Sequence, residues 1–168
     1  KMHIWQSGAV VRYLAELTGT KPGDQLLAAQ VDAVFDTTQE LFPPLNPTVN
    51  VTTGEIYQQR KEAFLDSFPA TLANFARQLE RANDGPFFFG SKPYYCDFAA
   101  YHHFSLAQIL KSDVLAMHPS VLKLMEAVET LPGVSEYLAE RPEIIDVGTA
   151  PKLVINGVAE PTGTSPSS

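Results

Sequence analysis

The sequence predicts an all-α helical bundle, and two observations carry that prediction. Apolar residues recur at helical spacing through most of residues 7–140, and Gly or Pro clusters separate one periodic segment from the next. The stretch from Gly90 to Leu110, GSKPYYCDFAAYHHFSLAQIL, is apolar on nearly every side of the helix that it would form. Because a helix of that kind belongs in the middle of a bundle, we expect the other helices to pack around it.

Length and composition limit the classes of protein that fit. A chain of 168 residues can form one well-filled core, and it is too short for two ordinary domains with linkers. The net charge of −7 and the lack of a basic cluster argue against nucleic acid or an anionic membrane as a main partner. No apolar run approaches the roughly 18–20 residues of a membrane span. A single cysteine excludes an internal disulfide and suits a reducing compartment such as the cytoplasm, with an organelle left open.

The first predicted elements are a short extended piece and a helix over residues 7–17. Ser7 is predicted to cap this helix. Gly19 and Pro22-Gly23 end it and make a linker over residues 19–24. Since the chain begins with Lys1-Met2, we expect that residue 1 is not the natural start. The i, i+3, i+4, i+7 stripe of the helix consists of Val10, Tyr13, Leu14 and Leu17.

Periodicity and proline positions predict the next three segments. A helix runs from Asp24 to about Phe42 and ends before Pro43-Pro44. Residues 43–54 lack a helical period and contain several turn formers, so they are predicted to be a loop. A long helix follows over residues 55–81. Pro69 is expected to bend or split it, since proline removes one backbone hydrogen bond.

Two shorter helices are predicted after the central one, over residues 120–130 and 134–140. Pro132-Gly133 and Arg141-Pro142 end them. Residues 148–168 hold one apolar run, Leu153-Val154-Ile155, and then a PTGTSPSS end. We expect an extended or disordered tail over these residues.

Asp97 lies in the first turn of the central helix, where a carboxylate can accept hydrogen bonds from free backbone N–H groups. The position three residues earlier is Tyr94, which has no short hydroxyl to complete a capping box. Asp97 is therefore predicted to be the structural cap of this helix.

Three separated motifs together resemble the glutathione transferase family, in its sigma- and mu-like forms. The first is Gln6-Ser7 followed by an apolar helix that ends in Arg12-Tyr13-Leu14-Ala15. The second is the glycine, polar loop and aspartate that open the central helix, within residues 85–110. The third is the LPGV…YLA…RP string of residues 131–142. The resemblance covers residues 1 to about 145.

The resemblance implies the helical bundle of that family's C-terminal domain, with a remnant (a short strand plus one helix) of a thioredoxin-like domain. Residues 1–18 would end the thioredoxin-like domain, 19–24 would be the linker, 25–147 the helical domain and 148–168 the tail.

Gln6 and Ser7 are the glutathione-binding residues that the resemblance implies. In that family the Gln-Ser pair holds the γ-glutamyl end of glutathione, and the serine hydroxyl and the helix N-terminus receive its carboxylate. A helix N-terminus with a serine suits an anion. The residues alone favour the simpler interpretation that Ser7 only caps its own helix.

No catalytic residue is predicted in this chain. In the resembled family the Tyr, Ser or Cys that activates the glutathione thiol lies near the start of the thioredoxin-like domain. Cys96 lies near a helix N-terminus, but a buried core thiol is the better interpretation. His102 and His103 point about 100° apart on one helix, so no metal site is predicted. The aromatic residues that could line an electrophile pocket, each of them also a core candidate, are Phe35, Phe42, Tyr101 and Phe104.

Two functional hypotheses follow. As a glutathione S-transferase-like enzyme, the protein would let the glutathione thiolate attack an electrophile, with glutathione as co-substrate. As a non-catalytic structural or docking subunit, it would use the helical domain as a surface in a larger assembly. In either case we expect another protein surface to bury the apolar face formed by Val10, Tyr13, Leu14 and Leu17. That surface belongs to the protein's own thioredoxin-like domain or to a partner protein, and the resemblance leaves a homodimer open.

Overall fold

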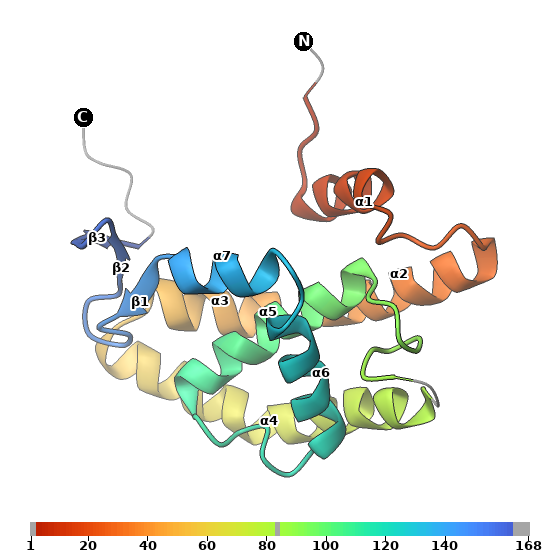
Figure 1. Ribbon diagram of the computed structural model, residues 1–168. Coiled ribbons are helices and arrows are strands. Elements are labelled where there is room, and N and C mark those ends of the chain that lie inside the picture. The colour runs from red at the N-terminus through yellow and green to blue at the C-terminus, as the bar shows by residue number, and fades with distance from the viewer. Residues whose placement is uncertain (1–2, 83–84, 163–168) are drawn as a thin grey trace.

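A computed structural model describes residues 3–82 and 85–162, and Figure 1 shows a helical bundle followed by a small sheet. The helices are α1 (Ser7–Thr18), α2 (Gln25–Gln39), α3 (Phe42–Asn50), α4 (Gly54–Arg81), α5 (Tyr95–Leu110), α6 (Pro119–Glu129) and α7 (Val134–Glu140). The strands are β1 (Glu143–Ile145), β2 (Lys152–Ile155) and β3 (Val158–Pro161).

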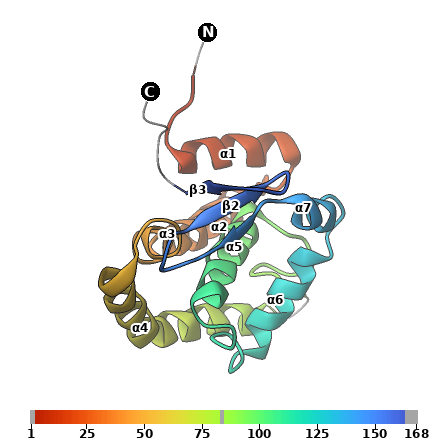
Figure 2. The ribbon, with the colours of Figure 1, turned by 90° about the vertical axis from the view of Figure 1, so that its left-hand side faces the viewer.

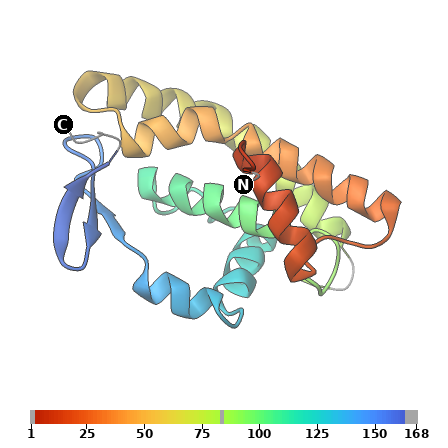
Figure 3. The ribbon, with the colours of Figure 1, turned by 90° about the horizontal axis from the view of Figure 1, so that it is seen from above.

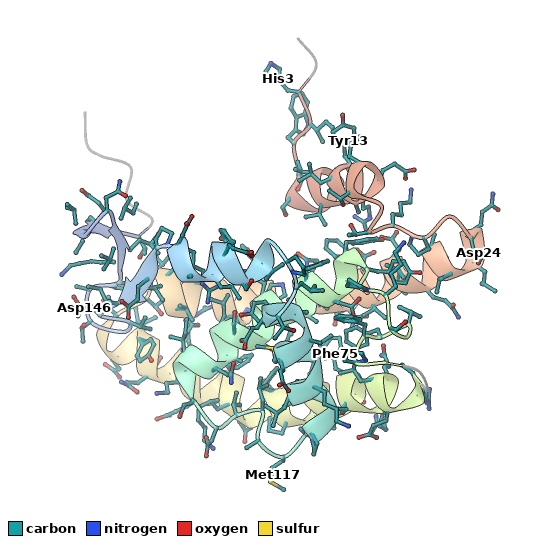
Figure 4. The ribbon with its side chains drawn as sticks, in the orientation of Figure 1. His3, Tyr13, Asp24, Phe75, Met117 and Asp146 are labelled. Carbon is teal, nitrogen blue, oxygen red and sulfur yellow. The ribbon has the colours of Figure 1, made fainter. Side chains whose placement is uncertain are left out.

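Helix α5 is the centre of the bundle, as its composition predicts. It contacts α1, α2, α3 and α6, and Figure 3 shows it enclosed by the other elements. Ala100, Phe104 and Ala107 are fully buried. The ring of Phe104 meets the edge of Phe75 from α4 with 5.4 Å between centroids, and Figure 4 shows Phe75 in the interior of the bundle. Aromatic packing of this kind joins the two longest helices of the described chain.

Helix α4 continues through Pro69 and is not split there. The apolar face that Phe68, Leu72 and Phe75 form is buried on both sides of the proline. Burial of these large side chains, about 1.5–3 kcal/mol each, offsets the loss of one backbone hydrogen bond. The helix therefore keeps its register across the proline.

The loop predicted over residues 43–54 is wrong for most of its length, because Phe42–Asn50 forms α3. Pro43 and Pro44 lie in the first turn, where backbone N–H groups have no helical partner and proline is tolerated. Pro47 lies farther in, and the carbonyl of Pro43 that it leaves unpaired accepts a bond from Arg60 Nη2 at 2.8 Å. Burial of Leu45 and Val49 then holds the helix against the bundle.

The short strand predicted before α1 is not formed, since residues 3–6 lie outside every strand of the structure. A strand needs a neighbouring strand to satisfy its backbone groups. None of the described residues lies in such a position beside residues 3–6.

The chain after α7 forms an antiparallel sheet in the order β1-β2-β3 (Figure 2). Leu153 is opposite Ile144 on one side and Glu160 on the other. Asn156 and Gly157 connect β2 to β3 with φ angles of 51° and 78°, the left-handed pair that a tight two-residue hairpin requires. The tail was predicted to be extended or disordered, and residues 152–161 are extended. Residues 163–168 lie outside the described residues.

Gly148 fastens the sheet to the bundle. Its carbonyl accepts a bond of 2.9 Å from Gly54 N at the start of α4, and its φ angle is +82°. A Cβ added there would lie 2.5 Å from ring carbons of Tyr57, which is closer than atoms can pack. Only glycine satisfies both the backbone conformation and the close approach.

We predict that Gly148→Ala lowers the free energy of unfolding by about 1–3 kcal/mol, because Tyr57 must shift and the backbone is strained. Urea denaturation measures the loss, and hydrogen exchange over residues 152–161 should rise as the sheet loses its contact. Gly157→Ala is the matched control, since Gly157 also has a positive φ of 78° but no atom within 4 Å of an added Cβ. Equal losses in both variants would contradict the role of the Tyr57 contact.

Candidate functional site

Gln6 and Ser7 lie where the chain enters α1. Gln6 has φ 76° and ψ 115°, and its carbonyl accepts the first helical bond, from Val10 N at 3.1 Å. The prediction that Ser7 caps α1 is wrong: Ser7 is the first helical residue, and no side chain of a described residue caps this end. The sharp turn at Gln6 moves Ser7 one position into the helix. The Ser7 hydroxyl therefore does not cap its own helix, and Ser7 is exposed in the first turn, where backbone N–H groups have no helical partner.

Arg12 ties α1 to the bundle. Its Nε lies 2.6 Å from Asp32 Oδ1 and its Nη2 lies 2.6 Å from Asp36 Oδ1, both on α2. Tyr95 of α5 donates its hydroxyl to the same Asp32 oxygen at 2.7 Å. Burial alone would raise the pKa of Asp32, but the bonds from Tyr95 and Arg12 outweigh it and leave this pKa below its ordinary value. Three helices thus share one polar network that fixes the helix carrying Gln6 and Ser7.

A cavity of about 610 Å³ lies between α1, α2 and α5. Its walls are mostly apolar, and its size is that of a small-molecule site. Ser7 and Leu14 contribute from α1, and Phe98 and Ala99 contribute from α5. Ser7 therefore stands at the edge of an apolar cavity, so one ligand could contact both the polar end of α1 and the apolar wall.

The four aromatic candidates divide into two pairs. Phe35 and Phe42 line this cavity. Tyr101 and Phe104 do not, because they lie on other sides of α5. Tyr101 donates its hydroxyl to Glu129 Oε1 of α6 at 3.1 Å, and Phe104 is fully buried against Phe75. The cavity wall also includes Gln39, which no sequence pattern indicated, and His103, which the sequence offered only as a possible metal ligand.

His103 is the unusual group of this cavity. The residue is 2% exposed, and its Nδ1 has no hydrogen-bond partner among the described residues. Burial, with a smaller effect of nearby His102, lowers the pKa of His103 to about 4. The imidazole is therefore neutral at pH 7, and the cavity carries no charge at this position.

Asp97 joins the loop before α5 to the helix itself. Its Oδ2 accepts the Tyr94 N–H at 2.7 Å and its Oδ1 accepts the Phe88 N–H at 2.9 Å. The Asp97 N–H in turn donates to the Tyr94 carbonyl at 2.9 Å. A backbone carbonyl thus takes the place of the hydroxyl in the reciprocal capping pattern. Asp97 is fully buried, so this carboxylate acts within the fold and not on a ligand.

The remaining candidates are the Cys96 thiol and possible metal ligands. Cys96 is fully buried, and burial raises the pKa of its thiol far above the ordinary value. It is therefore a core residue. Over residues 3–82 and 85–162, no group of three or more His, Cys, Asp or Glu could hold a metal ion. In the same residues, no helix has both the length and the apolar character to cross a bilayer.

The sequence of this chain is similar to known proteins of one family. Residues 46–141 match the family model described as "Glutathione S-transferase, C-terminal domain". Hematopoietic prostaglandin D synthase of Rattus norvegicus is 27% identical over 141 residues, and that of Gallus gallus is 30% identical over 149 residues. Each of these alignments covers 83% of this chain and 68% of the relative. A probable glutathione S-transferase of Caenorhabditis elegans is 26% identical over 146 residues, with 83% and 69% covered.

Solved structures agree in fold. The pi-class glutathione S-transferase of Onchocerca volvulus has a TM-score of 0.73 at 23% identity, covering 83% of this chain and 66% of that one. Rat hPGDS in complex with a quinoline has a TM-score of 0.72 at 25% identity, with 83% and 69% covered. The matched part of this chain spans about two thirds of the length of these proteins. The chain therefore belongs to the glutathione S-transferase family, and its bundle is the C-terminal helical domain of that family.

Proposed function

We propose that this chain is the larger part of a glutathione-conjugating enzyme. Gln6 and Ser7 hold the γ-glutamyl end of glutathione, and the cavity between α1, α2 and α5 takes the electrophile. The glutathione sulfur forms a bond to the electrophilic carbon, and the leaving group departs with its electron pair. The group that activates the thiol belongs to a part of the protein outside these 168 residues.

One observation carries the proposal: Ser7, at the positive end of α1, lines the same cavity as the apolar side chains of α2 and α5. Backbone N–H groups at a helix N-terminus attract a carboxylate, and the Ser7 hydroxyl, which does not cap α1, can add a hydrogen bond. A bound glutathione would therefore have its carboxylate at Ser7 and the rest of the molecule at the mouth of an apolar cavity. That arrangement brings a charged co-substrate and an apolar electrophile together.

The exposed face of α1 supports the presence of a further domain. Tyr13, Leu14 and Leu17 are each at least half exposed, and Figure 4 shows Tyr13 on the side of α1 away from the bundle. An apolar patch of this kind marks an interface. We propose that a thioredoxin-like domain of the same protein covers it, with residues 1–18 as the end of that domain.

Calorimetric titration of the full-length protein with glutathione tests the proposal. We expect binding, and we expect Ser7→Ala to weaken it about tenfold, since a hydrogen bond to a charged group contributes about 1.5 kcal/mol or more. Ser135→Ala, an exposed serine on α7, is the matched control and should leave the affinity unchanged. An absence of glutathione binding would overturn the proposed enzyme and leave the docking subunit as the hypothesis to pursue.

A further inference from the structure

The central helix is buried on most sides and is open along one stripe. Phe98, His102, Ser105 and Ile109 lie on this stripe at helical spacing, and each is half-buried or exposed. Off the stripe only Ala99 and Gln108 are half-buried, and the other residues of the helix are buried. From Phe98 to Ile109 the stripe is about 17 Å long at about 1.5 Å per residue. A helix in the middle of a bundle leaves such a stripe open only where no other element covers it.

Two cavities follow the stripe and meet at His102. The first is the cavity beside Ser7, which Tyr95, Phe98, Ala99 and His102 line. The second has a volume of about 590 Å³, and His102, Ser105, Leu106 and Ile109 line it. His102 is part of both walls, so the two cavities adjoin at this residue, and we call them together the groove along α5. Figure 3 shows α1 over one end of α5, with the sheet beyond the other end.

One side of the second cavity is lined by elements that follow α6. Leu138 comes from α7, Ile144 from β1 and Leu153 from β2, and all three are half-buried. The two strand residues lie after residue 141, where the match to the family model ends. The distal half of the groove is therefore built partly by a sheet outside the matched domain.

The positive charge at the distal end comes from Arg141, and Glu143 brings a negative charge to the same wall. Arg141 lines the second cavity, and it takes part in none of the ion pairs that the described residues form. Glu143 also lines the cavity and is exposed. Ser105 and Asn50 supply further polar groups. A guanidinium without a carboxylate partner, next to an apolar wall, suits a ligand whose apolar body ends in an acid.

We infer that the groove along α5 takes an elongated apolar electrophile with an acidic terminus, which Arg141 binds. This inference rests on the proposed function, because the reacting end is placed in the first cavity, beside glutathione. The apolar body passes His102 and lies against Leu106, Leu153 and their neighbours. The C-terminal sheet thus selects for length, and Arg141 selects for the acid.

Unreactive alkyl chains separate the contribution of ligand length from that of the acidic terminus. Dodecanoate and dodecanol are titrated into the protein by calorimetry, with hexanoate as the short acid. We expect dodecanoate to bind more tightly than either of the others. Arg141→Gln should weaken dodecanoate about five- to tenfold and leave dodecanol unchanged, whereas Arg141→Lys should keep part of the preference. Arg77→Gln, the same substitution at an exposed position on α4, is the control.

A second variant tests the length of the groove. Ile109 is 41% exposed at the rim of the second cavity, so Ile109→Asp should fold normally and weaken both dodecanoate and dodecanol, while hexanoate changes little. Equal affinity of dodecanoate for the wild type and Arg141→Gln would overturn the inference. So would full dodecanoate binding to Ile109→Asp, which would confine the ligand to the first cavity. If no chain binds, the inference fails.

Glutathione titration of the same variants keeps the two proposals separate. Arg141→Gln should bind glutathione as the wild type does. If glutathione does not bind at all but dodecanoate binding depends on Arg141, the enzyme proposal fails and only the placement of a reacting end is lost. If glutathione binds and the Arg141 and Ile109 variants change nothing, the groove inference fails and the enzyme proposal stands.

Discussion

Replacing Asp97 with alanine is expected to lower the free energy of unfolding by about 3–5 kcal/mol, the largest loss that we predict for one substitution. The N–H groups of Phe88 and Tyr94 donate to the Asp97 carboxylate at 2.9 Å and 2.7 Å in a buried site. Without the carboxylate both donors stay buried and unsatisfied, at a cost of about 1–3 kcal/mol each. The start of α5 also loses the negative charge that its dipole favours. A change of this size approaches the whole stability of many domains.

Urea denaturation of the purified variants at pH 7.5 measures this loss. Asp97→Asn is the informative intermediate, since it keeps the shape and one acceptor oxygen but faces the second N–H with a donor. It should lose less than Asp97→Ala and more than nothing. Asp113→Ala, at an exposed carboxylate in the turn after α5, should have an effect near zero. If Asp97→Ala were as stable as Asp113→Ala, the carboxylate would not be the group that holds the loop to the helix.

The position of α5 could be predicted because a single property decides it. A helix with apolar residues on every side can only lie inside, and Asp97 marks its start. The same reasoning failed at residues 43–50, where the prolines were interpreted as the end of one helix. In the structure they occupy the first turns of the next helix, and a bond from Arg60 satisfies the carbonyl that Pro47 leaves. That bond joins residues distant in sequence, so local pattern could not reveal it.

The sequence contains one indication of the sheet. Asn156-Gly157 follows the apolar run of β2, and this dipeptide favours a two-residue hairpin. What the sequence could not show is the docking of the sheet, which depends on Gly148 meeting the ring of Tyr57. Contacts of that kind are visible only once both segments have folded.

Only part of the candidate site could be predicted from the sequence. Gln6 and Ser7 were reached through the family motif, and the structure brings Ser7 to the edge of an apolar cavity. The residues of α5 that face this cavity could not be predicted, because every face of that helix is apolar and periodicity does not single one out. His102, His103 and Arg141 were therefore not assigned to a cavity before their neighbours were known.

His103 leads to the second large prediction, a dependence of stability on pH. Burial lowers the pKa of His103 to about 4 in the folded protein, against an ordinary value near 6.5 in the unfolded chain. Below about pH 6.5 the unfolded chain therefore binds a proton that the folded protein does not. The stabilisation by neutral His103 is complete above that pH and is lost as the pH falls toward 4, by about 3 kcal/mol in total.

A second buried group acts in the opposite direction over part of this range. Burial raises the pKa of Asp97 to about 6, although the bonds from Phe88 and Tyr94 oppose this effect. Its carboxyl holds a proton in the folded protein between about pH 4 and 6, where the unfolded chain has lost it. The stability from this group is therefore present at low pH and lost as the pH rises through 6. In the wild type the two effects partly cancel between pH 4 and 6.

Comparison of the wild type with His103→Leu isolates the histidine, because Asp97 contributes equally to both proteins. Leucine fills a similar buried volume and cannot titrate, so the variant should fold. We expect the difference in unfolding free energy, wild type minus variant, to fall by about 3 kcal/mol between pH 7.5 and pH 4. Urea denaturation at intervals across this range measures it, and His3→Leu, at an exposed position before α1, is the matched control. A difference that stays constant would mean that His103 is protonated in the folded protein, and that the cavity beside Ser7 is charged at acidic pH.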